Sequence, residues 1–237
     1  MDGVKLLNRM DTKFLTDYDT LISVSEEVSN DYKVLEIAGN RLSRYETLYY
    51  DTEDLYFYTQ HHRGKTNRYK FRKRTYVESD LSFMEVKFKN NKKRTIKNRV
   101  MIDEAEYELG SSNRDYIKSV AQLDKELVPI LMNTFSRITL VNERLPERLT
   151  IDLGLAFGEG VEEKKLNKVV IIEAKQEKAS RLSPFIIALK KRLVRPCSFS
   201  KYCIGIALTT EGVKKNRFKP ILRNVNKIEN NHVTATV

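Results

Sequence analysis

The 237-residue sequence contains only two cysteines, three histidines, five prolines and nine glycines. The two cysteines, Cys197 and Cys203, are too few for a disulfide framework, so we expect two reduced, inert thiols. The histidines include no pair at the i, i+4 spacing of a helical metal site, and we expect the adjacent His61 and His62 in a surface loop. The scattered glycines and prolines form no linker, which favours a single main domain.

Long apolar runs are also missing. No segment approaches the roughly 20 apolar residues that span a bilayer, and residues 1–13 lack the apolar core of a signal peptide. We therefore expect a cytoplasmic protein. Acidic residues are fewer than basic ones: the sequence has 32 Asp and Glu and 43 Lys and Arg, which gives a net charge of +11. This excess favours a polyanionic partner, whether nucleic acid, an anionic membrane surface or a phosphate-rich small molecule.

Strands and helices are both expected. Helices are predicted from residue 16 or 17 to 27, from 111 or 112 to about 131, and from Pro184, with Ser183 as the N-cap, to about 193. The sequence therefore predicts an α+β fold in which about eight antiparallel strands close a barrel with helices packed outside. This domain spans residues 1–212, and a basic tail with a short helix near 220–225 spans 213–237. Nine segments alternate polar and apolar residues with the period of a strand: residues 9–15, 44–50, 68–76, 82–88, 95–101, 135–141, 148–153, 169–175 and 199–205.

Basic side chains occupy every second position of the central strands. In residues 68–76 one face carries only Arg and Lys, whereas the other begins with Tyr69 and Phe71. The simpler interpretation is a sheet with one solvated face. Like charges side by side are, however, destabilising unless an anion lies among them. Closing the strands into a barrel would collect these faces in one lumen, which predicts a tunnel that binds a polyanion.

Seven short motifs, in order over about 190 residues, resemble the VTC domain of polyphosphate polymerases, within the triphosphate tunnel metalloenzyme (CYTH-like) superfamily. The motifs are Arg9-Met-Asp-Thr-Lys-Phe14, Glu46-Thr-Leu-Tyr-Tyr-Asp-Thr52, Arg68-Tyr-Lys-Phe-Arg-Lys-Arg-Thr-Tyr76, Phe83-Met-Glu-Val-Lys-Phe-Lys89, Arg148-Leu-Thr-Ile-Asp152, Ile172-Glu-Ala-Lys175 and Ser198-Phe-Ser-Lys-Tyr202. The resemblance implies a tunnel in which ATP donates its γ-phosphate to a growing polyphosphate chain with Mn²⁺ or Mg²⁺. Such a reaction depends on positioning and electrostatics, and its phosphate nucleophile needs no protein base.

The resemblance also implies roles for individual residues. Catalytic roles fall to Arg72, Lys87, Arg137, Arg148 and Lys201. Phosphate-binding roles fall to Lys13, Lys70, Arg74, Lys89, Lys97, Arg99 and Ser200. Glu173 matches the metal-binding glutamate, with Glu85 and Asp152 as weaker candidates. The alternative for Glu173 is an internal ion pair with Lys175 or a facing arginine.

Two positions depart from the pattern. Arg9 stands where the wider superfamily opens with a glutamate, which favours a polymerase over a hydrolase. Ser198 stands where some VTC domains have a second lysine. Two alternatives remain open: a tunnel triphosphatase acting on tripolyphosphate or nucleoside triphosphates, and a module that binds polyphosphate or nucleic acid without catalysis. Tyr69, Phe71 and Phe88 fall opposite the cations, which disfavours nucleic acid. The family's eukaryotic members sit in membrane complexes, so a membrane partner here would be a separate chain.

Overall fold

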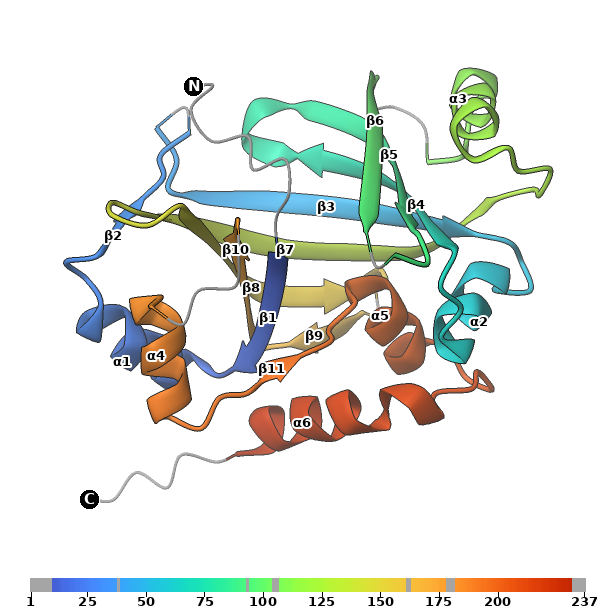
Figure 1. The fold of residues 1–237 in the computed structure, drawn as a ribbon. Helices are drawn as coiled ribbons and strands as arrows, with labels where there is room; N and C mark the ends of the chain where they lie inside the picture. The colour runs from blue at the N-terminus through green and yellow to red at the C-terminus, as the bar shows by residue number, and fades with distance from the viewer. Residues whose placement is uncertain are drawn as a thin grey trace.

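The computed structural model describes residues 10–37, 39–92, 94–103, 107–160, 163–177 and 182–231. They form an α+β fold in which one large, curved antiparallel sheet is covered by six helices (Figure 1). The strands are β1 Met10–Thr16, β2 Tyr32–Val34, β3 Leu42–Asp51, β4 Arg68–Tyr76, β5 Leu81–Lys89, β6 Thr95–Ile102, β7 Val128–Asn142, β8 Glu147–Phe157, β9 Lys164–Leu166, β10 Val170–Gln176 and β11 Pro196–Cys197. The helices are α1 Tyr18–Glu27, α2 Tyr56–Arg63, α3 Ser111–Ala121, α4 Pro184–Lys191, α5 Lys201–Thr209 and α6 Lys219–Asn230, and the 3₁₀ turn η3, Asn216–Phe218, precedes α6.

The sheet is open, so the closed barrel expected from the sequence is not confirmed. Its strand order is β11-β1-β10-β8-β7-β3-β4-β5-β6, with β2 paired to β7 and β9 to β8. Across the described residues no ladder joins the two ends of this order. One end strand, β11, contains only Pro196 and Cys197, and a proline has no N–H to donate to a further strand.

Eight of the nine predicted strands are present; most bounds differ by a few residues, but the strand predicted at 135–141 is the longer β7, which begins at Val128. The ninth, 199–205, is wrong because this segment enters helix α5. Ser200 is the N-cap, and its Oγ accepts a hydrogen bond from the Cys203 backbone N–H at 3.2 Å. Residues 202–207 are all buried, so the segment shows neither a strand nor a helix period, and its sequence pattern cannot distinguish the two.

Two further differences concern helices. The helix predicted from 111 to 131 ends at Ala121, where Gln122 adopts a left-handed conformation, and β7 begins at Val128. Helix α2 was not predicted; it ends at Arg63, and its C-cap Gly64 has a φ of +74°. His61 and His62 lie on this helix and are partly buried, so their assignment to a surface loop was wrong. The helix predicted from residue 16 or 17 to 27 is confirmed as α1, and the structure shows Asp17 as its N-cap. The helix predicted from Pro184, with Ser183 as N-cap, is confirmed as α4, which ends at Lys191 and not near 193.

The apolar faces of the strands are turned outward beneath helices, as predicted. Phe14, Leu149 and Ile172 pack with residues of α1 and α4, while Phe71 and Met84 pack with residues of α3. The opposite face, which we call the inner face, keeps the polar side chains of β1, β4, β5, β8 and β10. A third cluster, which includes Leu15, Tyr45 and Phe135 on this inner face, packs against α5 and α6.

The C-terminal part is more structured than the short helix near 220–225. Helix α6 extends over Lys219–Asn230, and its Val225 and Ile228 are buried. Among the described helices, none has the length and apolar character that crossing a bilayer requires.

Candidate functional site

Antiparallel register aligns the predicted basic residues in rows across β4, β5 and β6. Lys70 lies directly opposite Lys87, which lies directly opposite Lys97. In the neighbouring row, Glu85 stands between Arg72 and Arg99. Directly opposed like charges are unfavourable in a sheet. The three-lysine row therefore indicates a surface made for an anion.

Glu85 is the carboxylate of this part of the site, and it is already engaged. It is fully buried, and Arg72 donates to its Oε2 at 2.5 Å from Nη2 and 2.7 Å from Nε. Lys97 contacts the other carboxylate oxygen. Burial opposes ionisation, but Arg72, Arg74 and Lys97 hold the pKa of Glu85 well below its usual range. Glu85 thus stays charged and has little attraction left for Lys87.

Lys87 is the cation whose charge is repelled most by its neighbours. The positive charge of Arg72, then burial, then Arg74 hold its pKa well below the usual range. Burial and the charges of Lys13, Arg68 and Arg72 likewise lower the pKa of Lys70 to about 8. An anion among these groups would raise the pKa values of both lysines again.

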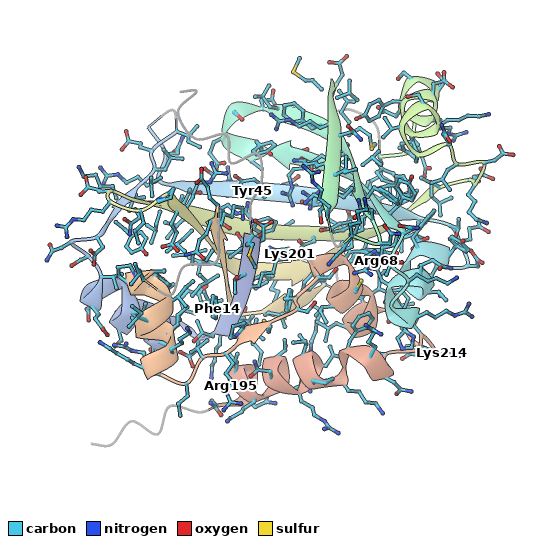
Figure 2. The ribbon with its side chains drawn as sticks, viewed as in Figure 1. Phe14, Tyr45, Arg68, Arg195, Lys201 and Lys214 are labelled. Atoms are coloured by element: carbon cyan, nitrogen blue, oxygen red, sulfur yellow. The ribbon has the colours of Figure 1, made fainter. Side chains whose placement is uncertain are left out.

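A second cluster surrounds Asp152 on β8. Arg137 donates two hydrogen bonds to its carboxylate, at 2.5 and 2.8 Å, and Lys201 contacts Oδ2. The guanidinium of Arg137 also lies over the rings of Tyr45 and Phe135, 5.0 and 5.3 Å from their centroids. Figure 2 places Lys201 near the middle of the curved sheet, below Tyr45. Burial lowers the pKa of Lys201 to about 7 even with Asp152 beside it.

A third cluster contains Glu173, the predicted metal ligand. Lys175 Nζ lies 3.0 Å from Glu173 Oε1, and Lys13 is its direct partner on β1. Burial opposes ionisation, yet Lys13 and Lys175 hold the pKa of Glu173 well below its usual range. The ion pair with Lys175 that we considered as the alternative is therefore present.

A metal site made of protein ligands alone is not apparent. The described residues contain no group of three His, Cys, Asp or Glu side chains placed to hold a metal ion. Glu173 nevertheless keeps 18% of its side chain exposed, and Mg²⁺ bound to phosphates commonly takes only one or two carboxylates. The described residues therefore fit a metal ion that takes only one or two protein carboxylates and the rest of its ligands from other oxygens.

The start of α5 bridges the two halves of the open sheet. Lys70 Nζ on β4 donates to Ser200 Oγ at 2.8 Å, and Lys13 Nζ on β1 donates to the Phe199 carbonyl at 2.9 Å. The next residue, Lys201, reaches Asp152 on β8. Three predicted phosphate-binding or catalytic lysines thus meet at one short segment.

The remaining predicted residues lie at the margins of the inner face. Arg148 is exposed at the start of β8, opposite Lys175. Arg99 is exposed on β6, where its guanidinium lies 4.7 Å from the Phe83 centroid. Lys89 is partly buried near the end of β5. Arg9 lies outside the described residues.

Sequence reasoning missed the contact that holds α5 in place, between Asp51 and Tyr202. Both residues lie in quoted motifs, at 46–52 and 198–202. Asp51, at the end of β3, is fully buried and accepts hydrogen bonds from the backbone N–H groups of Phe57 and Tyr58 at 2.9 and 2.8 Å. It thereby caps α2, whose N-cap residue Leu55 supplies no side-chain bond. The Tyr202 hydroxyl donates to the same carboxylate. Asp51 therefore fixes the residue next to Lys201.

We expect Tyr202→Phe to weaken tripolyphosphate binding about tenfold, because loss of a hydrogen bond to a charged group costs about 1.5–3 kcal/mol and frees the start of α5. Calorimetric titration measures this change. Tyr58→Phe is the matched control: it removes a hydroxyl from the same apolar cluster, where it donates to the Lys214 carbonyl at 2.9 Å. Equal loss of affinity in both variants would refute the positioning role of Tyr202.

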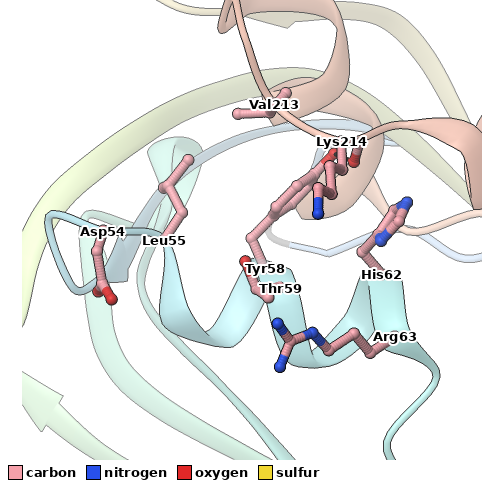
Figure 3. A pocket seen from close by; sticks show the side chains of 8 residues that line it. All are labelled: Asp54, Leu55, Tyr58, Thr59, His62, Arg63, Val213 and Lys214. Atoms are coloured by element: carbon pink, nitrogen blue, oxygen red, sulfur yellow. Dashed lines mark hydrogen bonds between the residues drawn. The ribbon is translucent and has the colours of Figure 1, made fainter.

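A separate hollow lies between α2 and the segment that follows α5 (Figure 3). None of the predicted site residues lines it; the lining residues are Asp54, Leu55, Tyr58, Thr59, His62, Arg63, Val213 and Lys214. The inner face, with its three carboxylate-centred clusters, remains the candidate site.

Comparisons with known proteins agree with this geometry. The family model described as the VTC domain matches residues 8–210. A candidate adenylate cyclase from Bacillus halodurans superposes with a TM-score of 0.51 at 14% identity, over 81% of this chain and 94% of that one. A candidate adenylyl cyclase from Hippeastrum, for which a dominant triphosphatase activity is described, has a TM-score of 0.50 at 13% identity, over 84% and 96% of the two chains. At these identities the two structures show a shared fold. No curated protein matches the sequence.

Proposed function

Since the chain belongs to the VTC domain family, we propose that it is a polyphosphate polymerase, which transfers the γ-phosphate of ATP to the end of a polyphosphate chain. The inner face is its active site. The family match covers most of the chain, and the shared fold of the two neighbours is compatible with a phosphate-chain substrate.

The observation that carries this proposal is the row of three opposed lysines, Lys70, Lys87 and Lys97. Glu85, the carboxylate in the neighbouring row, is already paired with Arg72 and Lys97. A chain of phosphates supplies negative charges at regular intervals, and so it neutralises a row of cations better than a single carboxylate does.

In the proposed reaction, an oxygen of the terminal phosphate of the polymer attacks the γ-phosphorus of ATP. The bond from that phosphorus to the bridging oxygen breaks, and ADP leaves with the electron pair. Arg72 and Lys87 stabilise the charge on the transferring group, while Arg137 and Lys201 hold the neighbouring phosphates. The phosphate nucleophile is already ionised near neutral pH, which is consistent with an inner face built from cations and carboxylates.

Mg²⁺ or Mn²⁺ would enter with the phosphates and supply charge neutralisation between them. Glu173 is the side chain we assign to this ion. Its pairing with Lys175 would then be exchanged for, or shared with, the metal.

Glu173→Gln is expected to lower metal-stimulated turnover about tenfold or more while nucleotide binding stays within about twofold, because the amide is a poorer metal ligand of the same shape. Turnover against Mn²⁺ concentration and a separate binding titration measure the two effects. Glu163→Gln, which breaks a surface pair with Lys165, serves as the control. Parallel loss of binding and turnover in Glu173→Gln would assign this residue to the ion pair alone.

The proposal is tested by incubating the protein with ATP and Mn²⁺ and resolving the products by gel electrophoresis. Long phosphate chains together with ADP support it. Free phosphate without chain growth would identify a tunnel triphosphatase, and binding of polyphosphate without any product would identify a non-catalytic module.

A further inference from the structure

The exposed side of α6 carries a row of cations. Lys219, Arg223 and Lys227 follow one another at four-residue intervals, so they lie along one side of the helix about 6 Å apart. All three are exposed, and no ion pair between described residues involves them. Like charges at this spacing destabilise a helix, which indicates an anionic partner outside the chain.

The acidic residue of α6 does not neutralise this row. Glu229 is turned to the loop before β10, where its carboxylate accepts hydrogen bonds from the backbone N–H groups of residues 167–169 at 2.8–3.1 Å. The apolar side of α6 is also committed, because Val225 and Ile228 are buried in the core. The helix can therefore attract a surface through its charges but cannot insert into one.

An exposed leucine accompanies these charges. Leu193 follows α4 at the position where a helix commonly ends in glycine; its φ is +59° and the residue is 82% exposed. Its backbone N–H donates to the Lys190 carbonyl at 2.9 Å, and Lys190 and Arg195 on either side are exposed. A leucine at this position is unfavourable for two reasons: a non-glycine residue adopts a positive φ, and a large apolar side chain is exposed to water. A partner that buries the side chain would explain its presence.

The turn and the helix lie along the same side of the molecule. Figure 2 shows Arg195 and Lys214 on the lower side of the view, toward opposite ends of α6. Cys197, two residues after Arg195, packs against the same cluster as Val225 and Ile228. We call the exposed residues Lys190, Leu193, Arg195, Lys219, Arg223 and Lys227 the basic face.

We propose that the basic face docks on an anionic lipid surface, with its cations at the headgroups and Leu193 at the boundary of the acyl chains. Phosphate-rich headgroups match the charges, and a hydrocarbon layer accepts an aliphatic side chain. A single-stranded nucleic acid would call for exposed aromatic rings. The nearby aromatic residue Phe218 instead packs against Tyr58 and His62. This inference does not depend on the proposed activity.

Sedimentation with lipid vesicles tests the proposal. The full chain is expected to bind vesicles of phosphatidylcholine with one quarter phosphatidylserine, and not vesicles of phosphatidylcholine alone. The double variant Arg223→Glu with Lys227→Glu should bind at least about 30-fold more weakly, since each cation near the surface contributes about fivefold. The matched control is Arg114→Glu with Lys118→Glu, which reverses a pair at the same spacing on α3, on the upper side of Figure 1. It should change binding by no more than about threefold.

The variant Leu193→Gly tests the apolar part of the proposed membrane contact independently. Glycine suits the positive φ, so thermal stability should hold or rise, while vesicle binding should fall about tenfold with the lost apolar contact. Equal binding to both kinds of vesicle, equal weakening by the two charge-reversal pairs, or no binding to either vesicle would overturn the proposal. Preferential binding of single-stranded DNA in competition with the vesicles would overturn it as well.

Discussion

Replacement of Lys87 by methionine is expected to lower polyphosphate synthesis at least about 100-fold without lowering thermal stability. Lys87 stands between Lys70 and Lys97 and beside Arg72, so its charge is repelled in the ligand-free protein. Methionine preserves the length of the side chain and removes that repulsion. The same charge is expected to stabilise the transferring phosphoryl group, where loss of one donor typically costs two to three orders of magnitude.

Product formation from ATP and the melting temperature should both be measured for this variant. Lys73→Met is the matched control, because Lys73 lies on the same strand as Arg72 but on its opposite face. Retained synthesis in Lys87→Met would remove the inner face from the mechanism. A large drop in melting temperature would instead show that Lys87 supports the fold.

Affinity for long-chain polyphosphate is expected to fall at least about 100-fold between pH 7 and pH 9. Burial lowers the pKa of Lys201 to about 7 and those of Lys70 and Lys97 to about 8. A bound polyanion requires these lysines charged, so each loses about tenfold in binding per pH unit above its pKa. Titrations at constant ionic strength measure the effect, and Lys201→Arg, which keeps its charge, should make the dependence shallower.

Stability of the ligand-free protein should change in the opposite direction. A lysine whose pKa is lowered by folding binds more protons in the unfolded chain between about pH 7 and its ordinary pKa near 10.4. Stability contributed by these groups therefore rises with pH across that window. Affinity that stays constant from pH 7 to pH 9 would mean that these lysines do not contact the polymer.

Alternation along single strands was enough to predict which side chains share the inner face. In β4, Lys70, Arg72 and Arg74 all point inward and contact Ser200, Glu85 and Thr47, whereas Phe71 is buried on the other side. Period-two patterning is a local property, and the structure confirms it. The family resemblance was inferred from seven motifs in order along the chain, and the match over residues 8–210 confirms the family.

The pairing of the strands, and whether the sheet closes into a barrel, could not be predicted from the alternation. Whether β6 meets β11 depends on curvature accumulated over the whole sheet, which no single segment encodes. The contact of Asp51 with Tyr202 joins residues 151 positions apart. Helix α5 could not be recognised either, because residues 202–207 are all buried and show no helical alternation of polar and apolar residues. Such features depend on long-range contacts, which a single sequence does not show.

The open edge at β6 gives its cations a further use. The residues from Thr95 to Met101 are exposed, although only 33% of the Lys97 side chain is, and Ile96, Val100 and Met101 are the large apolar ones among them. A bare strand of this composition invites the edge of another molecule, and natural proteins discourage such pairing with lysine and arginine. Lys97 and Arg99 therefore also disfavour self-association through this edge. A long polyanion that neutralises both charges would favour pairing of the β6 edges of two copies.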